Sequence, residues 1–391
     1  MSTPESRTAA GPRILLAPDK FKGSATAEQV AQSIAAGIRR VRPDARITIL
    51  PIADGGEGTI DAVVLAGADR RVARVRDPLG RSTEAGWAVI DAGGRRSAVV
   101  ESAAASGLAF VAPDVDSALR SSSAGTGQLI AAALDEGVDE VVVTLGGSAM
   151  TDGGAGALAA LGARLRDDRG AVLDDEGALT IERVAELDLS GLDPRLASLD
   201  LRLAVDVDNP LTGERGAAAV FSPQKGADAA TVARLDRALR RWARVLFAAT
   251  GVDPDRAGCG AAGGFPSAFV AAAGAELVAG SELVAQLIDL EAAIVDADLV
   301  VVGEGSLDEQ SLGGKAPIAA ARMAAAAGVP VAAVAGVCSV SEEALRAEGV
   351  LWSVALVDLA PSVAAARAEA PRWLEIAGER IAAELRGSAP E

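Results

Sequence analysis

The sequence predicts an α/β protein in which a doubly wound parallel-sheet domain, built from both ends of the chain, carries a second α/β domain as an insertion. Three observations lead to this prediction. Short apolar runs alternate with helical patterns at the start of the chain, a β-rich pattern replaces them from Arg71 to Val100, and the first rhythm returns from Leu299 onward. We therefore expect one domain over residues 1–72 and 287–391, and an inserted domain over residues 73–286.

The first elements show the strand–helix alternation. Arg13 to Ala17 is a short apolar run typical of a buried strand. A helix is expected over residues 26–38, because its first residue is Thr26 and a glutamine stands three residues later, as in a capping box. Residues 47–52 form the next strand and residues 59–65 begin the next helix. This opening favours a parallel sheet that is covered on both faces.

The middle of the chain is expected to be richer in strands. Residues 71–75, 83–90 and 97–100 read as strands, and the sequence Asp-Ala-Gly-Gly at 91–94 as a hairpin turn between two of them. Further strands are expected at 141–145 and 200–207, and helices at 155–161 and 231–248. Near the end, strands are expected at 299–302, 331–334 and 352–357, and helices at 317–327 and 370–385.

Composition excludes several classes of protein. The net charge of −17 argues against a nucleic-acid or membrane-surface partner, because phosphate groups would be repelled. The absence of histidine removes His-based triads and leaves acid–base chemistry to Asp, Glu or Lys. Two cysteines indicate a reducing cytosol, so we expect a cytoplasmic protein. Residues 1–12 are polar and are expected to be a frayed leader rather than a signal peptide. A homodimer is one option for the assembly.

Loops rich in glycine and aspartate follow five of the predicted strands. Glycine lets backbone N–H groups approach an anion closely, and carboxylates beside it can hold Mg²⁺ or take a proton. These are the parts required to move a phosphoryl group onto a small hydroxylated substrate. The loops cover residues 18–24, 53–59, 146–154, 206–210 and 303–308.

The first loop places two cations at the carboxyl edge of the sheet, where ligands bind in doubly wound folds. Lys20 and Lys22 lie beside Gly23 and Ser24, so this loop is a candidate anion site. A solvated loop that ends in a helix cap would have the same residue types, and this alternative stays open.

The second loop has more glycines than a helix cap requires. Gly55, Gly56 and Gly58 would form a tight turn into the following helix, with Asp54 as a candidate acid or base. The alternative is that Asp54 and Glu57 only complement the helix dipole.

The third loop joins a strand to a helix start and is a candidate anion site. Its candidate residues are Gly146, Gly147, Ser148, Asp152, Gly153 and Gly154. A G-x-G-x-x-A match over residues 154–159 is weak, because it comes well after the strand end. Residues 258–264 are also dense in glycine, and a hinge, a closely packed helix start and a ligand loop all remain open for them.

The last two loops supply acidic residues and a lysine. Asp206 and Asp208 would point the same way from an extended strand end and could share a cation, whereas a paired-Asp turn is the alternative. Because histidine is absent, we predict Asp206 as general base, with Asp54 as its rival, and Asp208 with Asp206 as metal ligands. Glu304 and Asp308 follow a strand, and Lys315 can meet a phosphate at a helix start. Lys22 and Lys315 are expected to offset substrate negative charge.

The ordered set of motifs resembles the bacterial glycerate kinase family. The match extends from Ile14 to about Ala360, and departs where many members have Arg at the position of Ser306 and His near Gly313. The motifs are APDKFKGS at 17–24, ADGGEGT at 53–59, LGGSA at 145–149, DGGAG at 152–156, DVDNPL at 206–211, PQKGA at 223–227 and GEG at 303–305.

The resemblance implies a flavodoxin-like domain with a second α/β domain inserted. It also implies ATP-dependent phosphorylation of D-glycerate with Mg²⁺, and we expect 2-phosphoglycerate rather than 3-phosphoglycerate as the product. A kinase for another short hydroxy acid and a non-catalytic small-anion binding protein are the alternatives. An enzyme better explains the many carboxylates, since these repel an anion unless a metal or a proton transfer is involved.

Overall fold

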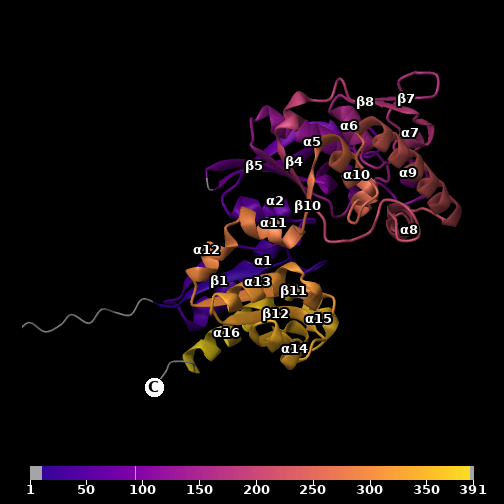
Figure 1. Ribbon diagram of the computed structural model, residues 1–391. Helices are drawn as coiled ribbons and strands as arrows, with labels where there is room; N and C mark the ends of the chain where they lie inside the picture. The colour runs from indigo at the N-terminus through magenta and orange to yellow at the C-terminus, as the bar shows by residue number, and fades with distance from the viewer. Residues whose placement is uncertain (1–10, 93, 388–391) are drawn as a thin grey trace, which may run out of the picture. The chain divides into compact units, whose positions relative to one another are not determined.

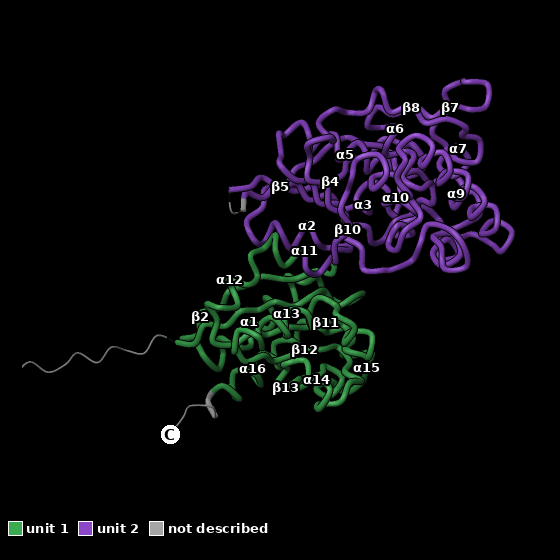
Figure 2. Tube along the Cα trace, viewed as in Figure 1, with its two compact units in different colours: residues 1–54, 284–391 green, residues 55–283 purple. Residues whose placement is uncertain are grey.

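The chain forms two compact units, one of residues 1–54 and 284–391 and the other of residues 55–283 (Figure 2). The computed structural model describes residues 11–92 and 94–387 (Figure 1). The leader expected over residues 1–12 thus falls almost wholly outside the described residues, and so does Gly93 of the expected hairpin turn.

The first unit contains a five-stranded parallel sheet in the order β13-β12-β11-β1-β2. Counted by their order within the unit, the strands run 2-1-3-4-5, which is the flavodoxin-like order. The predicted doubly wound parallel sheet is confirmed. Strand order reverses between β1 and β11, and ligands bind beside the carboxyl ends of strands at such a point. The strands are β1 (Arg13–Pro18), β2 (Arg46–Ile49), β11 (Leu299–Leu307), β12 (Val331–Cys338) and β13 (Val350–Ala355).

Helices α1 (Ala27–Val41) and α16 (Ala370–Gly387) pack closely against each other in this unit (Figure 1). A side chain at Gly37 would place its Cβ only 1.9 Å from the carbonyl oxygen of Glu375, so only glycine allows this approach. The predicted capping box at the start of α1 is confirmed, with Thr26 Oγ1 accepting from the Gln29 amide at 3.2 Å. Both helices share one buried core with alternate residues of β1, such as Ile14 and Leu16.

Helices α12 (Leu290–Val295) and α13 (Ala316–Ala326) pack against each other, and α13 also contacts β1, β11 and β12. Shorter helices complete the unit: α14 (Glu342–Ala347) packs on β13, and α15 (Val363–Ala368) on α16. The long buried strands and small helical residues explain how a chain with few aromatic side chains builds this core.

The second unit contains a mixed sheet in the order β10-β9-β6-β5-β4-β3. The first four strands of this order run parallel, and β5, β4 and β3 pair antiparallel. The strands are β3 (Asp69–Arg76), β4 (Ser82–Ala92), β5 (Arg95–Glu101), β6 (Glu140–Thr144), β9 (Asp200–Ala204) and β10 (Glu276–Val278). A separate antiparallel pair is formed by β7 (Arg164–Arg166) and β8 (Glu186–Asp188).

The helices of the second unit surround a core that includes four of its aromatic residues, namely Trp87, Trp242, Phe265 and Phe269. Phe265 and Phe269 stack with ring centroids 4.8 Å apart, and Trp242 donates from Nε1 to the carbonyl oxygen of Gly153 at 2.9 Å. The principal helices are α2 (Thr59–Leu65), α5 (Ala124–Asp135), α6 (Ala155–Ala160), α8 (Ala217–Phe221), α9 (Ala229–Thr250) and α10 (Ala261–Ala273), and α11 (Gly280–Leu287) leads back to the first unit.

The boundaries between the units differ from those expected from the sequence. The first lies after Asp54 instead of after residue 72, and the second after Leu283 instead of after residue 286. Helix α2 packs on β4 and β5, and β3 pairs with β4, so all of these elements belong to the second unit. A β-α pattern in the sequence does not show which sheet its members join.

The glycine-dense segment 258–264 is a site of close backbone packing. Ala262, Gly263 and Gly264 have positive φ angles of 48°, 69° and 89°, and they kink the start of α10. A Cβ at Gly263 would lie 2.0 Å from the carbonyl oxygen of Met150. Of the three options that the sequence left open, the structure therefore shows the closely packed helix start.

Candidate active site

A cavity of about 610 Å³ lies within the first unit, beside the carboxyl ends of β1, β11 and β12. This is the edge where the strand order reverses, so its position agrees with the rule for doubly wound sheets. Its polar part is lined by Asp19, Lys20, Lys22, Ser24, Asp54, Glu304, Ser306 and Lys315. The structure thus brings together candidates from three loops that are far apart in the sequence.

Asp19 is held at the end of β1 by its neighbours. Its amide donates to the carbonyl oxygen of Gly303 at 2.7 Å, and its Oδ1 accepts from the Lys20 amide at 2.6 Å. The Lys20 ammonium lies 3.8 Å from the same oxygen. Burial raises the pKa of Asp19 to about 6, and the nearby Asp54 carboxylate also raises it. The site therefore contains a carboxylate for which additional positive charge would be favourable.

Glu304 is a second carboxylate of the cavity; it is buried and lies on β11. Burial raises its pKa above the usual range, and the Asp19 carboxylate also raises it. Its Oε1 is buried and has no hydrogen-bond partner among the described residues, while its Oε2 lies 3.8 Å from the ammonium of Lys315. An incompletely paired buried carboxylate is well suited to a cation or a hydrogen-bond donor that arrives with a ligand.

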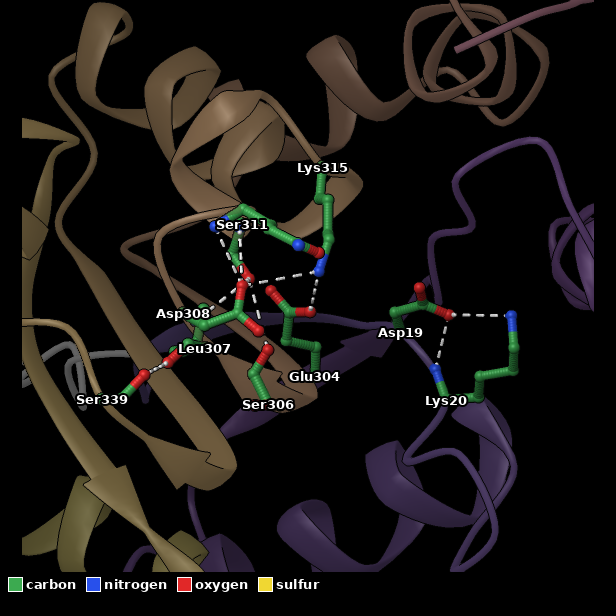
Figure 3. Close-up of polar contacts among 10 residues, drawn as sticks. Asp19, Lys20, Glu304, Ser306, Leu307, Asp308, Ser311, Lys315 and Ser339 are labelled. Carbon is green, nitrogen blue, oxygen red and sulfur yellow. Dashed lines mark hydrogen bonds and ion pairs between the residues drawn. The ribbon is translucent and has the colours of Figure 1, made fainter. Parts of the chain in front are cut away.

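The turn after β11 positions Lys315 at the start of α13. Asp308 Oδ1 accepts from the amides of Gln310 and Ser311 at 3.0 and 3.1 Å, and these bonds, the one from Ser311 foremost, lower the pKa of Asp308. Lys315 lies 3.8 Å from Asp308 Oδ1, so it contacts both Asp308 and Glu304 (Figure 3). Asp308 thus supports the turn, and Lys315 is one of the cations that line the cavity.

The loop between β1 and α1 is anchored by an aromatic side chain. Phe21 is buried and pairs with Ala25 in an isolated bridge, while Gly23 has a φ angle of 76°. This anchoring places Lys20 and Lys22 on the cavity wall. Gly23 has the left-handed backbone conformation that the turn requires, and its contact with an anion stays a prediction.

Glycines of the second loop allow backbone segments of the second unit to meet. A Cβ at Gly55 would lie 2.6 Å from Gly280 Cα, and one at Gly146 would lie 2.8 Å from Gly56 Cα. The amide of Gly280 also donates to Asp206 Oδ1 at 2.8 Å. Four candidates from three loops, namely Gly55, Gly56, Gly146 and Asp206, are therefore neighbours within this unit.

Glu101 is a residue that the sequence analysis missed. It ends β5, and its Oε1 accepts from the amides of Gly58 and Ile60 at 3.1 and 2.7 Å. Burial raises its pKa. Glu101 therefore holds the start of α2 and the loop that precedes it. The only signal in the sequence was an acidic residue directly after an apolar strand.

Asp152 is fully buried and organises the third loop of the second unit. It accepts hydrogen bonds from the amide and hydroxyl of Ser123 at 2.8 and 2.7 Å, and from the amides of Gly154 and Gly156 at 3.1 and 3.2 Å. Burial raises its pKa. Gly153 packs against the indole ring of Trp242, where a Cβ would approach to 2.3 Å. The bonds of Asp152 thus support the loop from inside.

Lys225 was also missed, although its motif had been noted. Its ammonium is buried and donates to Ser148 Oγ at 3.3 Å and to the carbonyl oxygen of Met150 at 2.5 Å. Burial lowers the pKa of Lys225 to about 7. A single lysine in a loop gives no sequence signal of burial, and only the packing of 223–225 under the glycine loop produces it.

The buried Lys225 predicts a specific pH dependence of stability. A lysine in the unfolded chain titrates near 10.4, so the unfolded state binds more protons than the folded state between about pH 7 and that value. The free energy of unfolding should therefore rise with pH in this window, by up to about 1.4 kcal/mol per pH unit. Lys225→Met should lack this contribution. Urea unfolding of both proteins near pH 7 and near pH 10 measures this contribution. The prediction is contradicted if the unfolding free energy changes by the same amount between the two pH values in the unmodified protein and in Lys225→Met.

Asp208 has an arginine partner. Both of its carboxylate oxygens accept from Arg215 NH2, at 2.7 and 2.8 Å, and this pair lowers the pKa of Asp208. In the part of the chain that the structure describes, no group of three or more His, Cys, Asp or Glu side chains is arranged to hold a metal ion. Metal binding by Asp206 and Asp208 stays a prediction.

Comparisons with known proteins agree with this arrangement of loops. A sequence model of the glycerate kinase family matches residues 14–386. The chain belongs to the glycerate kinase family. It is 42% identical to a glycerate kinase of Halalkalibacterium halodurans over 371 residues, which cover 94% of this chain and 97% of that protein.

Two further relatives extend the comparison. A glycerate 2-kinase of Escherichia coli is 44% identical over 327 residues, which cover 83% of this chain and 85% of that protein. A crystal structure assigned as glycerate kinase 2 of Salmonella typhimurium superposes with a TM-score of 0.84 at 41% identity, and covers 96% of this chain and 99% of that one. The chain is therefore an enzyme of the glycerate kinase type, and the alternative of a non-catalytic binding protein falls away. No helix among the described residues is both long and apolar enough to span a membrane.

Proposed function

We propose that this glycerate kinase family member transfers the γ-phosphoryl group of ATP to the 2-hydroxyl of D-glycerate. One observation carries the proposal: lysines and carboxylates, one of them buried, line a cavity at the point of strand-order reversal in a chain of this family. The E. coli relative is named a glycerate 2-kinase, which supports the 2-hydroxyl as the acceptor. We place the reaction in the cytoplasm, in keeping with the two free cysteines.

The proposed reaction forms one bond and breaks one. The hydroxyl oxygen of glycerate attacks the γ-phosphorus, the bond from this phosphorus to the β–γ bridging oxygen breaks, and ADP leaves. The hydroxyl proton passes to a carboxylate, which we assign to Asp206. Lys22 and Lys315 offset the charge of the phosphates, with Lys20, Ser24 and the loop glycines as further contacts. Mg²⁺, when bound, would supply positive charge that neutralises the transferred phosphoryl group.

Asp19 and Glu304 are suited to hold Mg²⁺. Glu304 is buried and Asp19 is partly buried, and burial raises the pKa of both carboxylates. Glu304 Oε1 lacks a hydrogen-bond partner among the described residues. Mg²⁺ is usually bound by one or two carboxylates together with substrate phosphates and water. Two carboxylates beside lysines in one cavity meet this requirement without a complete protein cage.

The function is tested by product analysis. We expect ADP release from MgATP that depends on D-glycerate, and we expect ¹³C and ³¹P NMR of the product to show the phosphate on the 2-oxygen. A folded sample that consumes no ATP in the presence of D-glycerate would refute the proposal. Phosphate on the 3-oxygen would correct the regiochemistry, and faster turnover of another short hydroxy acid would favour the alternative substrate.

Lys22→Ala and Lys315→Ala are each expected to lower kcat/KM by about 10²-fold, as the loss of one preorganised charge contact does elsewhere. Both side chains line the cavity, and Lys315 lies near two carboxylates. Steady-state kinetics measure the effect. Arg346→Ala is the matched control, because Arg346 is an exposed cation of the same unit whose only partner among the described residues is Glu342 on its own helix. Near-normal kinetics of either lysine variant would remove that lysine from the site.

A further inference from the structure

The cavity of the first unit has an apolar part that the transfer chemistry does not use. Away from the lysines, it is lined by Val337, Leu356, Val357, Val363, Ala366 and Ala370. These residues come from the end of β12, from the turn after β13, and from α15 and the start of α16. The cavity is therefore amphipathic. Charged groups lie at the ends of β1 and β11, and aliphatic groups lie at the end of β12 and on α15.

Two aliphatic side chains of this part remain open to solvent. Val363 is 57% exposed and Val337 is 38% exposed, whereas Val300, Val301 and Val302 of β11 are fully buried. Leu356, Ala366 and Ala370 are buried and form the floor beneath them. Aliphatic surface that lines a concave site and is left uncovered by its own fold favours an apolar or aromatic ligand group.

An arginine completes this part of the cavity. Arg367 lies on α15 between Ala366 and Ala370, and it lines the cavity. Within residues 11–92 and 94–387, no ion pair or hydrogen bond of its guanidinium is found. A planar guanidinium stacks on aromatic faces, including those of bases. The one aromatic residue in the cavity wall, Phe21, is buried and serves the first loop.

The size of the cavity also exceeds the needs of a three-carbon acid. Its volume of about 610 Å³ is in the range of sites for drug-sized ligands and cofactors. A nucleoside triphosphate has the matching polarity, because it joins a flat, weakly polar base to a chain of anionic phosphates.

We propose that the apolar part of this cavity binds the base and ribose of the nucleotide. The Arg367 guanidinium stacks on the base, and the side chains of Val337 and Val363 make apolar contacts with it. The phosphate chain then extends toward Lys20, Lys22 and Lys315. The first unit alone supplies the nucleotide site. This assignment rests on the proposed ATP-dependent function and extends that function by locating the nucleoside.

The test separates nucleoside contacts from phosphate contacts. Val363→Glu places a carboxylate where the base would lie, and Arg367→Ala removes the stacking group. Val363 is exposed and is the first residue of α15, where a glutamate complements the helix dipole, so folding should be preserved. Calorimetric titration with ADP is expected to show at least about tenfold weaker binding for Val363→Glu and a smaller loss for Arg367→Ala.

Inorganic tripolyphosphate is the second probe. It lacks a base, so Arg367→Ala and Val363→Glu should bind it nearly as the unmodified protein does, whereas Lys315→Ala should bind it less well. In kinetics, Val363→Glu should raise the KM for ATP and leave the KM for D-glycerate unchanged. Val72→Glu is the matched control, because Val72 is an exposed valine on β3 of the second unit.

The outcomes are distinguishable from those of the functional test. Unchanged ADP affinity in both cavity variants, with glycerate phosphorylation intact, would refute the nucleoside site and leave the proposed function standing. Equal losses for ADP and tripolyphosphate in Val363→Glu would also refute it, since the effect would then be one of charge. Selective loss of ADP binding in a protein that phosphorylates no glycerate would support the site and refute the proposed function.

Discussion

Asp206→Asn is expected to lower kcat by about 10²- to 10⁴-fold, the usual contribution of a general base. Asparagine keeps the shape of the side chain and its acceptor oxygen, so the hydrogen bond from the Gly280 amide can persist. What is lost is the negative charge that accepts the hydroxyl proton in the proposed reaction. Because the chain has no histidine, an aspartate or glutamate is the natural acceptor at neutral pH.

The measurement compares single-turnover rates of Asp206→Asn and Asp54→Asn, since Asp54 is the rival base. Asp54 lines the cavity of the first unit, and it is close enough to Asp19 to raise the pKa of that residue. If Asp206→Asn stays within a few-fold of the unmodified enzyme while Asp54→Asn abolishes turnover, the assignment of Asp206 is wrong. Asp208→Asn should have a modest effect if its main partner is Arg215, and a severe one if it binds metal.

Asp152→Ala is expected to lower the free energy of unfolding by about 3–5 kcal/mol, the typical cost of removing one partner from a buried charged network. The carboxylate accepts four hydrogen bonds in a fully buried position. Its removal leaves the amides of Ser123, Gly154 and Gly156 without their acceptor, and each buried unpaired donor costs about 1–3 kcal/mol.

Urea unfolding measures this loss, and Asp116→Ala serves as its control. Asp116 is an exposed aspartate of the same unit that pairs with Arg120 one turn away, so its removal should change stability by less than about 0.5 kcal/mol. If Asp152→Ala unfolds like the unmodified protein and instead raises the KM for ATP, then Asp152 binds phosphate as the sequence suggested. The expected loss of stability would instead show that Asp152 supports the loop.

Much of the fold followed from local patterns. The apolar runs of β1, β6 and β11, the capping box of Thr26 and the alternation of strand and helix at both ends of the chain were sufficient to predict a doubly wound sheet. The first loop was placed at the carboxyl edge of the sheet, where ligands bind in doubly wound folds. The cavity that joins this loop to Glu304 and Lys315 lies at that edge.

Other features depended on contacts between distant segments. The strand that pairs with β4 and the helix that covers it decide that the boundary lies at Asp54, and no local pattern records that choice. Glu101 and Lys225 are single residues whose importance arises only from burial beneath loops that are distant in the sequence. Their hydrogen-bond partners Ile60 and Met150 lie 41 and 75 positions away.

The sequence by itself therefore determined the class of fold, the carboxyl-edge loops and the residue types available for chemistry. Tertiary structure decided which of those residues face a cavity and which support a loop. The physical reason is that hydrogen bonding and burial act on atoms brought together by packing. Asp19 and Asp152 both stand in loops that follow buried strands, yet one lines a cavity and the other is enclosed by four donors.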